Sequence, residues 1–270
     1  MEATGWGVDR NSVHDWSKMV NGVQKYIRSL RWNAKLVLAE RQIKYYNMLA
    51  KFVDEHTLEL HDPKKNKKET VTAKNILIAV GGRPTYLANI PQELTISSDD
   101  IFYLKQNPGK TLVVGASYIA LECAGFLRGM GNDVTVMVRS ILLRSFDQGC
   151  AVKVGQYMEQ RGTKFIYGSV PERIEKTEDG KKKVTWTDKN GIEQSDVYDS
   201  VLVAIGRTAN TPYLNLEGAG VKYDTANLKI FTSDAEQTNV PHIYCVGDCA
   251  FGRPELTPPA VMVIKDIYNK

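Results

Sequence analysis

Apolar positions along the first third of the chain change from helical to strand spacing. Between residues 12 and 31 they recur every three or four positions, which predicts an amphipathic helix. From residue 35 to about residue 72 they are interleaved with polar residues and turn formers, which predicts strands. A short apolar run at 75–80 predicts another strand. Residues 81–84 (Gly-Gly-Arg-Pro) then predict a turn, because glycine and proline interrupt regular elements.

The middle of the chain alternates fully apolar segments with amphipathic ones. The apolar segments 111–115, 133–138 and 164–167 predict buried strands, and residues 117–130 and 147–161 predict helices between them. This order is typical of a parallel sheet with helices on its faces.

The next segment resembles an antiparallel meander. Asp179-Gly180 and Asn190-Gly191 are hairpin turn signals within residues 171–197, and an apolar strand is expected at 200–206. A meander followed by an apolar strand and a glycine occurs twice, ending near residues 83 and 207. Two copies of one nucleotide-binding design would give this repeat, although the first copy lacks its opening strand, glycine loop and helix.

Composition excludes some classes of function. With 43% hydrophobic residues, the 270-residue chain can bury a core, and its net charge of +4 predicts neither a nucleic-acid nor a membrane partner. Lysine runs at 64–68 and 181–183 are expected at solvated hairpin tips. Neither a bilayer-spanning apolar run nor a signal-peptide core is found, so we expect a soluble protein of the cytoplasm, with mitochondria as the open alternative.

The four cysteines are not spaced as metal ligands, and no histidine cluster accompanies them, so no metal site is expected. Cys245 and Cys249 are expected to be small residues packed near a turn. A redox pair is the less favoured interpretation, because nothing nearby is expected to lower a thiol pKa.

The strongest local signal is the glycine loop that joins the expected strand at 111–115 to the helix that follows. Gly115 permits a tight turn, the small Ser117 lets a pyrophosphate approach the backbone, and Ala120 lets the helix pack closely on the sheet. The helix N-terminus would then offer its N–H groups to phosphate. Ser117 replaces the usual middle glycine, and an ordinary strand–helix turn is the alternative.

The end of the next strand indicates which dinucleotide is bound. An NAD site places an acidic residue there, whereas this chain has Arg139, Ser140 and Arg144. Two guanidinium groups would bind a ribose 2′-phosphate through charge-assisted hydrogen bonds, which predicts NADPH. Either arginine alone could equally be a surface ion-pair residue.

At this point the chain resembles the high-molecular-weight (animal-type) thioredoxin reductases and the closely related thioredoxin–glutathione reductases, of the pyridine nucleotide-disulfide oxidoreductase family. Residues 110–148 carry most of the resemblance, with 97–100, 237–241 and 255–258 adding to it. The resemblance implies an α/β fold in which a Rossmann-like NADPH-binding domain (109–232) is inserted in an incomplete FAD-binding domain (1–108 and 233–270). Each of the two domains would carry a small antiparallel meander.

The resemblance also implies residue roles. Besides Arg139, Ser140 and Arg144, the NADPH site would comprise Gly115, Ser117, Tyr118, Ile119, Glu122, Gly206 and Arg207. Tyr118 would be a movable ring over the flavin, with plain packing at the helix start as the alternative. The FAD site would comprise Gly81, Gly247, Asp248, Glu255, Leu256 and Thr257. Asp248 would bind the ribityl chain, with capping of the next helix as the alternative.

Several parts of the family pattern are missing, so no catalytic residue is assigned. The chain has no Gly-x-Gly-x-x-Gly loop for FAD, no Cys-x-x-x-x-Cys redox pair and no His–Glu pair. We therefore expect a chain truncated at both ends. The complete enzyme would be a homodimer that passes electrons from NADPH to FAD, to a disulfide and then to thioredoxin or another disulfide substrate, contributing to redox homeostasis. The alternatives are an NADPH-binding module without turnover and a member resembling glutathione reductase.

Overall fold

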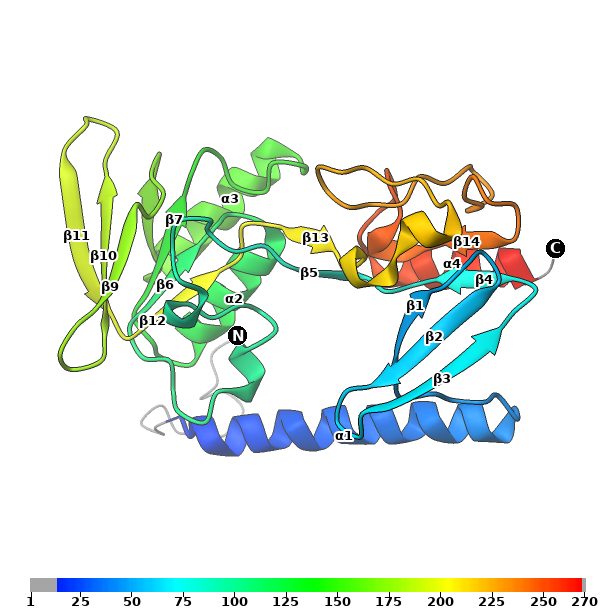
Figure 1. Ribbon diagram of the computed structural model, residues 1–270. Helices are drawn as coiled ribbons and strands as arrows, with labels where there is room; N and C mark the ends of the chain where they lie inside the picture. Colours follow the sequence, from blue (N-terminus) through cyan, green and yellow to red (C-terminus); the bar gives the residue numbers. More distant parts are fainter. Residues whose placement is uncertain (1–13, 269–270) are drawn as a thin grey trace. The chain divides into compact units, whose positions relative to one another are not determined.

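The computed structural model describes residues 14–268, with side chains described up to residue 262 (Figure 1). These residues form two compact units. Unit 1 comprises residues 14–37 and 84–206, and unit 2 comprises residues 38–83 and 207–268. The units reflect packing within the chain, and the division into domains at 109–232 stays a prediction.

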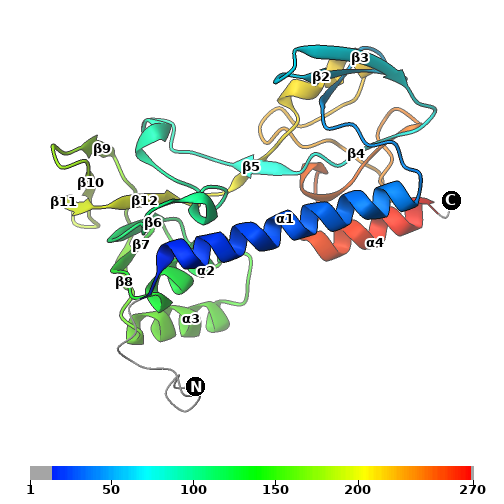
Figure 2. The same ribbon diagram turned by 90° about the horizontal axis from the view of Figure 1, so that it is seen from below.

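A single uninterrupted helix, α1 (Trp16–Glu40), opens the described chain (Figure 2). It confirms the expected helix but continues to Glu40, so the strand-like interpretation of residues 35–40 was wrong. Residues 32–40 are rich in Ala, Leu, Lys and Glu, whose helix propensity outweighs the weak alternation seen in the sequence. In unit 1, the Trp16 Nε1 group donates to the Leu104 carbonyl oxygen at 2.9 Å.

The core of unit 1 is a parallel sheet of four strands in the order β12-β6-β7-β8. Their bounds are β6 (Thr111–Val114), β7 (Val134–Val138), β8 (Lys164–Tyr167) and β12 (Ser200–Val203). Every residue of β6 and β7 is buried, as expected for central strands of a covered parallel sheet. The predicted parallel sheet and the positions of its strands are confirmed, although β12 ends at Val203 and not at residue 206.

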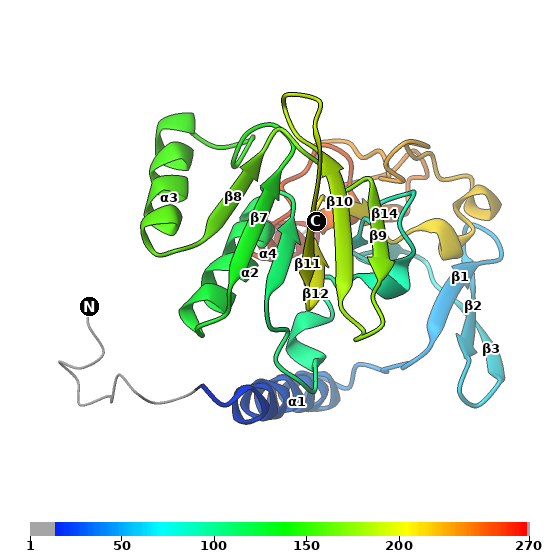
Figure 3. The same cartoon turned by 90° about the vertical axis from the view of Figure 1, so that its left-hand side faces the viewer.

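The two faces of this sheet are covered by different elements (Figure 3). On one face, Val113 and Val136 pack with the helices α2 (Tyr118–Gly129) and α3 (Gln148–Gln160). On the other face, Leu112 and Met137 pack with the meander. Its strands are β9 (Arg173–Lys176), β10 (Lys182–Thr187) and β11 (Glu193–Tyr198), in the order β11-β10-β9. The meander was predicted correctly, but it replaces the helices expected on that second face.

Unit 2 contains a three-stranded antiparallel sheet and two strand pairs. The sheet is β1 (Leu49–Phe52), β2 (Thr57–Asp62) and β3 (Lys67–Thr72), and the parallel pair is β4 (Ile76–Ile78) with β14 (Ile243–Cys245). The helices of unit 2 are α4 (Thr257–Tyr268) and the 3₁₀ helices η4 (Pro212–Leu214), η5 (Leu216–Ala219) and η6 (Gly247–Cys249). Unit 1 also contains two 3₁₀ helices, η2 (Gln92–Leu94) and η3 (Ile101–Tyr103).

The second strand pair of unit 2 corrects the turn expected at residues 81–84. Gly82–Pro84 forms the strand β5, which pairs with β13 (Arg207–Ala209). Only Gly81 in this segment adopts a left-handed conformation, with a φ of +65°. Pro84 is tolerated because it is the last residue of a two-stranded pair, where a missing N–H costs little.

Two features of the described residues concern membranes and metals. None of their helices is both long and apolar enough to cross a bilayer. Among the same residues, no group of three or more His, Cys, Asp or Glu side chains is placed to hold a metal ion.

Candidate functional site

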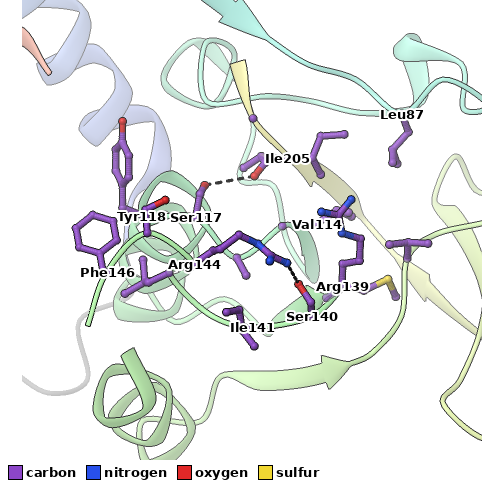
Figure 4. Close-up of a pocket in the computed structure, with 18 residues that line it drawn as sticks. Leu87, Val114, Ser117, Tyr118, Arg139, Ser140, Ile141, Arg144, Phe146 and Ile205 are labelled. Atoms are coloured by element: carbon purple, nitrogen blue, oxygen red, sulfur yellow. Dashed lines mark hydrogen bonds between the residues drawn. The ribbon is translucent and has the colours of Figure 1, made fainter. Parts of the chain in front are cut away.

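A cavity of about 380 Å³ opens at the carboxyl ends of the unit 1 strands (Figure 4). Ligands bind at this edge in open parallel sheets, because the loops that leave neighbouring strands converge there. The lining residues come from five segments of the chain: Leu87; 114–118; Met137 with 139–146 except Leu142; Val170; and 204–206.

Gly115 makes the turn from β6 into α2, as the sequence predicts. Its φ is +124°, a conformation that other residues rarely adopt. A Cβ at this position would collide with the Ala204 carbonyl oxygen at the end of the neighbouring strand. The close approach of two strand ends therefore requires glycine, independently of any ligand.

Ser117 occupies the N-cap position of α2 with an extended backbone (φ −75°, ψ 170°), and its side chain makes no capping hydrogen bond. Its Oγ atom instead lies 3.4 Å from the Ala204 carbonyl oxygen. The first-turn N–H groups of a helix have no partner within the helix, and here that helix end lines the cavity. This end of α2 is thus suited to bind an anionic group.

The loop after β7 brings the cationic side chains to the same cavity. Arg139, Ser140 and Arg144 all line it, and the Arg144 Nη2 atom donates to the Ser140 Oγ atom at 2.6 Å (Figure 4). All three residues are exposed, and none of the residues that line the cavity is acidic. The cavity is therefore suited to a ligand with two anionic groups, one at the N-terminus of α2 and one beside the arginines.

Gln148, which bonds to several carbonyl groups of this loop (139–146), was not identified from the sequence. The Gln148 Nε2 atom lies 3.1 Å from the Phe146 carbonyl oxygen, 3.2 Å from that of Leu143 and 3.4 Å from that of Leu142. Leu143 itself adopts a left-handed φ of +45°, and its N–H donates to the Ala116 carbonyl oxygen at 2.9 Å. Gln148 thus fixes the shape of the arginine loop (139–146), and the Leu143–Ala116 bond holds that loop against the glycine loop. No pattern in the sequence indicates this role.

Apolar side chains form another part of the lining that the sequence did not reveal. Leu87, Met137, Val170 and Ile205 come from separate segments, so no local motif joins them. They give the cavity an apolar wall, of the kind that packs against an aromatic ring system.

The other predicted NADPH residues are distributed unevenly. Tyr118 and Gly206 line the cavity, whereas Ile119 and Glu122 do not. Ile119 packs against the core of unit 1, and Glu122 is exposed on α2. Arg207 belongs to unit 2, where its Nη2 atom donates to the Gly82 carbonyl oxygen at 2.7 Å.

The predicted FAD residues all lie in unit 2. Gly81 and Gly247 adopt left-handed conformations, with φ values of +65° and +74°. The Glu255 carboxylate forms an ion pair with Lys229 at 2.8 Å, and Leu256 is exposed. Asp248 lies inside η6, whereas α4 begins at Thr257, so Asp248 does not cap that helix.

Two cysteines of unit 2 lie closer together than their spacing suggested. The Cys245 and Cys249 sulfur atoms are 3.4 Å apart and both residues are fully buried. The hydrogen bond with Cys245, together with the Gly81 and Val80 N–H groups, outweighs burial and lowers the pKa of the Cys249 thiol to about 7. The expectation that nothing nearby lowers a thiol pKa was therefore wrong, because Cys245 itself has the largest effect and the N–H groups reach the site from a distant part of the chain.

Comparison with known proteins gives two matches. Residues 7–263 match the family model described as pyridine nucleotide-disulphide oxidoreductase. The chain is 48% identical, over an alignment of 279 positions, to a protein named thioredoxin reductase SEP1 from Emiliania huxleyi. The alignment covers 100% of this chain and 55% of that relative, so the chain spans about half of the relative's length.

Proposed function

The chain belongs to the pyridine nucleotide-disulphide oxidoreductase family, and from this premise we propose that it forms the NADPH-binding part of a flavin-linked disulfide reductase of the thioredoxin reductase type. Within this type we propose the high-molecular-weight class, because residues 110–148 resemble it. The name of the relative from Emiliania huxleyi supports thioredoxin as the final electron acceptor.

One observation carries the proposal: a glycine loop at a helix N-terminus and a two-arginine loop line the same cavity. In the proposed complex the N-terminus of α2 holds the pyrophosphate. Arg139, Ser140 and Arg144 hold the ribose 2′-phosphate, and the apolar wall packs against the adenine ring. The donor set fits NADPH, since NADH lacks the phosphate that the two guanidinium groups would pair with.

The FAD site is proposed for unit 2. Gly81 and Gly247 are turns where the backbone can approach a ligand closely, and Asp248 is a half-buried carboxylate suited to bind hydroxyl groups. Glu255, Leu256 and Thr257 would lie near the flavin ring. The bound flavin would accept a hydride equivalent from NADPH and pass electrons to a disulfide.

The remaining parts of the proposal concern the complete protein. Residues 109–232 would be the NADPH domain, inserted between FAD-binding segments 1–108 and 233–270. Tyr118 would cover the flavin until the nicotinamide displaces it, with Glu122, Gly206 and Arg207 at the nicotinamide end. A homodimer is the expected assembly, in the cytoplasm, and it would reduce thioredoxin or a similar protein disulfide.

The visible absorbance spectrum tests this proposal. The purified chain is incubated with FAD, desalted and scanned before and after NADPH is added. Flavin bands that persist and bleach with NADPH support a working hydride-transfer site in this chain. A colourless protein that still binds NADPH would indicate that the chain is an NADPH-binding module without turnover. A protein that binds neither cofactor would overturn the proposal.

A further inference from the structure

Cys245 and Cys249 lie where the strand β14 passes into η6. Their sulfur atoms are 3.4 Å apart, although neither thiol is part of a disulfide, and both residues are fully buried. A disulfide bond is ~2.05 Å long, so the sulfur atoms need to approach each other by only about 1.4 Å.

The backbone between the two cysteines can absorb this movement. Gly247 lies between them with a φ of +74°, and it carries no side chain that would resist a change in the turn. Cys245 and Cys249 both pack in the apolar core of unit 2, and the neutral Cys249 thiol donates to the Val246 carbonyl oxygen at 3.3 Å.

The two thiols are not equivalent. The pKa of Cys249 is lowered to about 7 by the hydrogen bond with Cys245 and, against the effect of burial, by the Gly81 and Val80 N–H groups. The pKa of Cys245 is raised by the same hydrogen bond and by burial. One thiolate paired with one thiol is the arrangement in which the thiolate attacks and its partner resolves.

We propose that Cys245 and Cys249 are a redox-active dithiol that a hydroperoxide oxidises to a reversible disulfide. The Cys249 thiolate attacks one peroxide oxygen, the O–O bond breaks, and with hydrogen peroxide the other oxygen leaves as water after gaining a proton. Cys245 then loses its proton and attacks the sulfur of the Cys249 sulfenic acid. The S–S bond forms as the S–O bond breaks, and a second water leaves.

This sequence of steps is balanced. Two thiols give up two electrons and two protons, and one hydrogen peroxide becomes two waters. A dithiol reductant reverses the change by thiol–disulfide exchange. Hydrogen peroxide is the oxidant used in the test because it is small, and both sulfur atoms are buried.

The experiment uses the reduced, unmodified chain without NADPH or flavin, so its outcome is independent of the proposed function. After graded hydrogen peroxide, the protein is denatured in N-ethylmaleimide, and the peptide that carries both cysteines is weighed. We expect both alkylation sites to be lost together, with a peptide about 2 mass units lighter than the reduced one, and dithiothreitol to restore both. The exposed Cys150, on a different peptide, is the internal comparison.

Two variants identify the attacking thiol. Cys245→Ser keeps a hydrogen-bond donor beside Cys249, so dimedone is expected to trap a Cys249 sulfenic acid. Cys249→Ser is expected to leave Cys245 unlabelled under the same conditions. Circular dichroism checks that each variant is folded. If the unmodified chain keeps both thiols alkylatable at peroxide concentrations that oxidise Cys150, the proposal is overturned, whatever the variants show.

Discussion

Each unit contains an apolar strand of a parallel pair that runs into a glycine turn, but the turns differ in what surrounds them. In unit 1, β6 lies between β12 and β7, and a Cβ at Gly115 would collide with the end of β12. In unit 2, β14 forms a two-stranded sheet with β4, and a Cβ at Gly247 would meet only the Ala260 Cβ at 3.5 Å, an ordinary contact.

This difference explains why the same local design yields a cavity in unit 1. A binding crevice needs loops from neighbouring strands to converge on the glycine turn, and β7 supplies such a loop with Arg139 and Arg144. A strand followed by glycine specifies only a turn. The loops of the neighbouring strands are needed to make that turn part of a binding site.

The largest effect is expected when the two glycines are exchanged for alanine in separate variants. Gly115→Ala combines positive-φ strain with a backbone collision, so its free energy of unfolding should fall by about 3 kcal/mol and NADPH binding should be lost. Gly247→Ala should cost about 1–2 kcal/mol, the left-handed penalty alone, and leave NADPH binding intact. Denaturant unfolding and titration calorimetry measure both, and equal losses would show that the two turns do not differ as described.

The next effect concerns the arginine loop. Charge-assisted hydrogen bonds contribute about 1.5–3 kcal/mol each, so Arg139→Ala with Arg144→Ala should weaken NADPH binding by roughly 100-fold. NADH binding should change little, so the preference disappears. Arg173→Ala, which removes an exposed charge from the meander, is the matched control. A double variant that still discriminates the two dinucleotides would exclude these arginines as the 2′-phosphate site.

The third effect concerns Cys123, a buried cysteine of unit 1. Burial, with a smaller contribution from Glu122, raises the pKa of Cys123 to about 11. A raised pKa means that the folded state favours the neutral thiol. The stability that this preference contributes is present below the pKa of the unfolded chain and is lost as the pH rises through about 11. Between pH 9 and 11 the native chain should therefore lose roughly 1–2 kcal/mol more than Cys123→Ala does. Parallel pH curves for the two proteins would show that Cys123 carries no such shift.

The smallest effect concerns Gln148. A neutral hydrogen bond contributes about 1 kcal/mol, so Gln148→Leu should weaken NADPH binding by roughly 5-fold by loosening the arginine loop. NADH binding should change by less than about 2-fold, since NADH does not use that loop. Gln156→Leu, on the exposed side of the same helix, is the control. Equal weakening of both dinucleotides would assign Gln148 to general stability of the unit.

The sequence predicted the parts of the fold that local patterns determine. The strand Lys164–Tyr167 was predicted to the residue, and Gly115, Arg139 and Arg144 were identified as parts of one site because they follow adjacent apolar strands. The spacing of apolar residues and the presence of turn-forming residues act over a few positions, so both can be recognised directly in the sequence.

What the sequence missed depends on residues far apart in the chain. Gly82–Pro84 becomes a strand because Arg207–Ala209 lies beside it. The hydrogen bond with Cys245 lowers the pKa of the Cys249 thiol most, but N–H groups near residue 80 add to the effect. The Gln148 amide likewise reaches carbonyl groups that no motif marks. Such contacts are specified by the folded arrangement and leave no periodic signal.

The most direct test of the account is titration calorimetry of the unmodified chain with NADPH and with NADH. If Arg139, Ser140 and Arg144 bind the 2′-phosphate, NADPH should bind at least ~10-fold more tightly, since a single charge-assisted hydrogen bond supplies that factor. Equal affinities for the two dinucleotides, or no binding of either one, would contradict the assignment of this cavity.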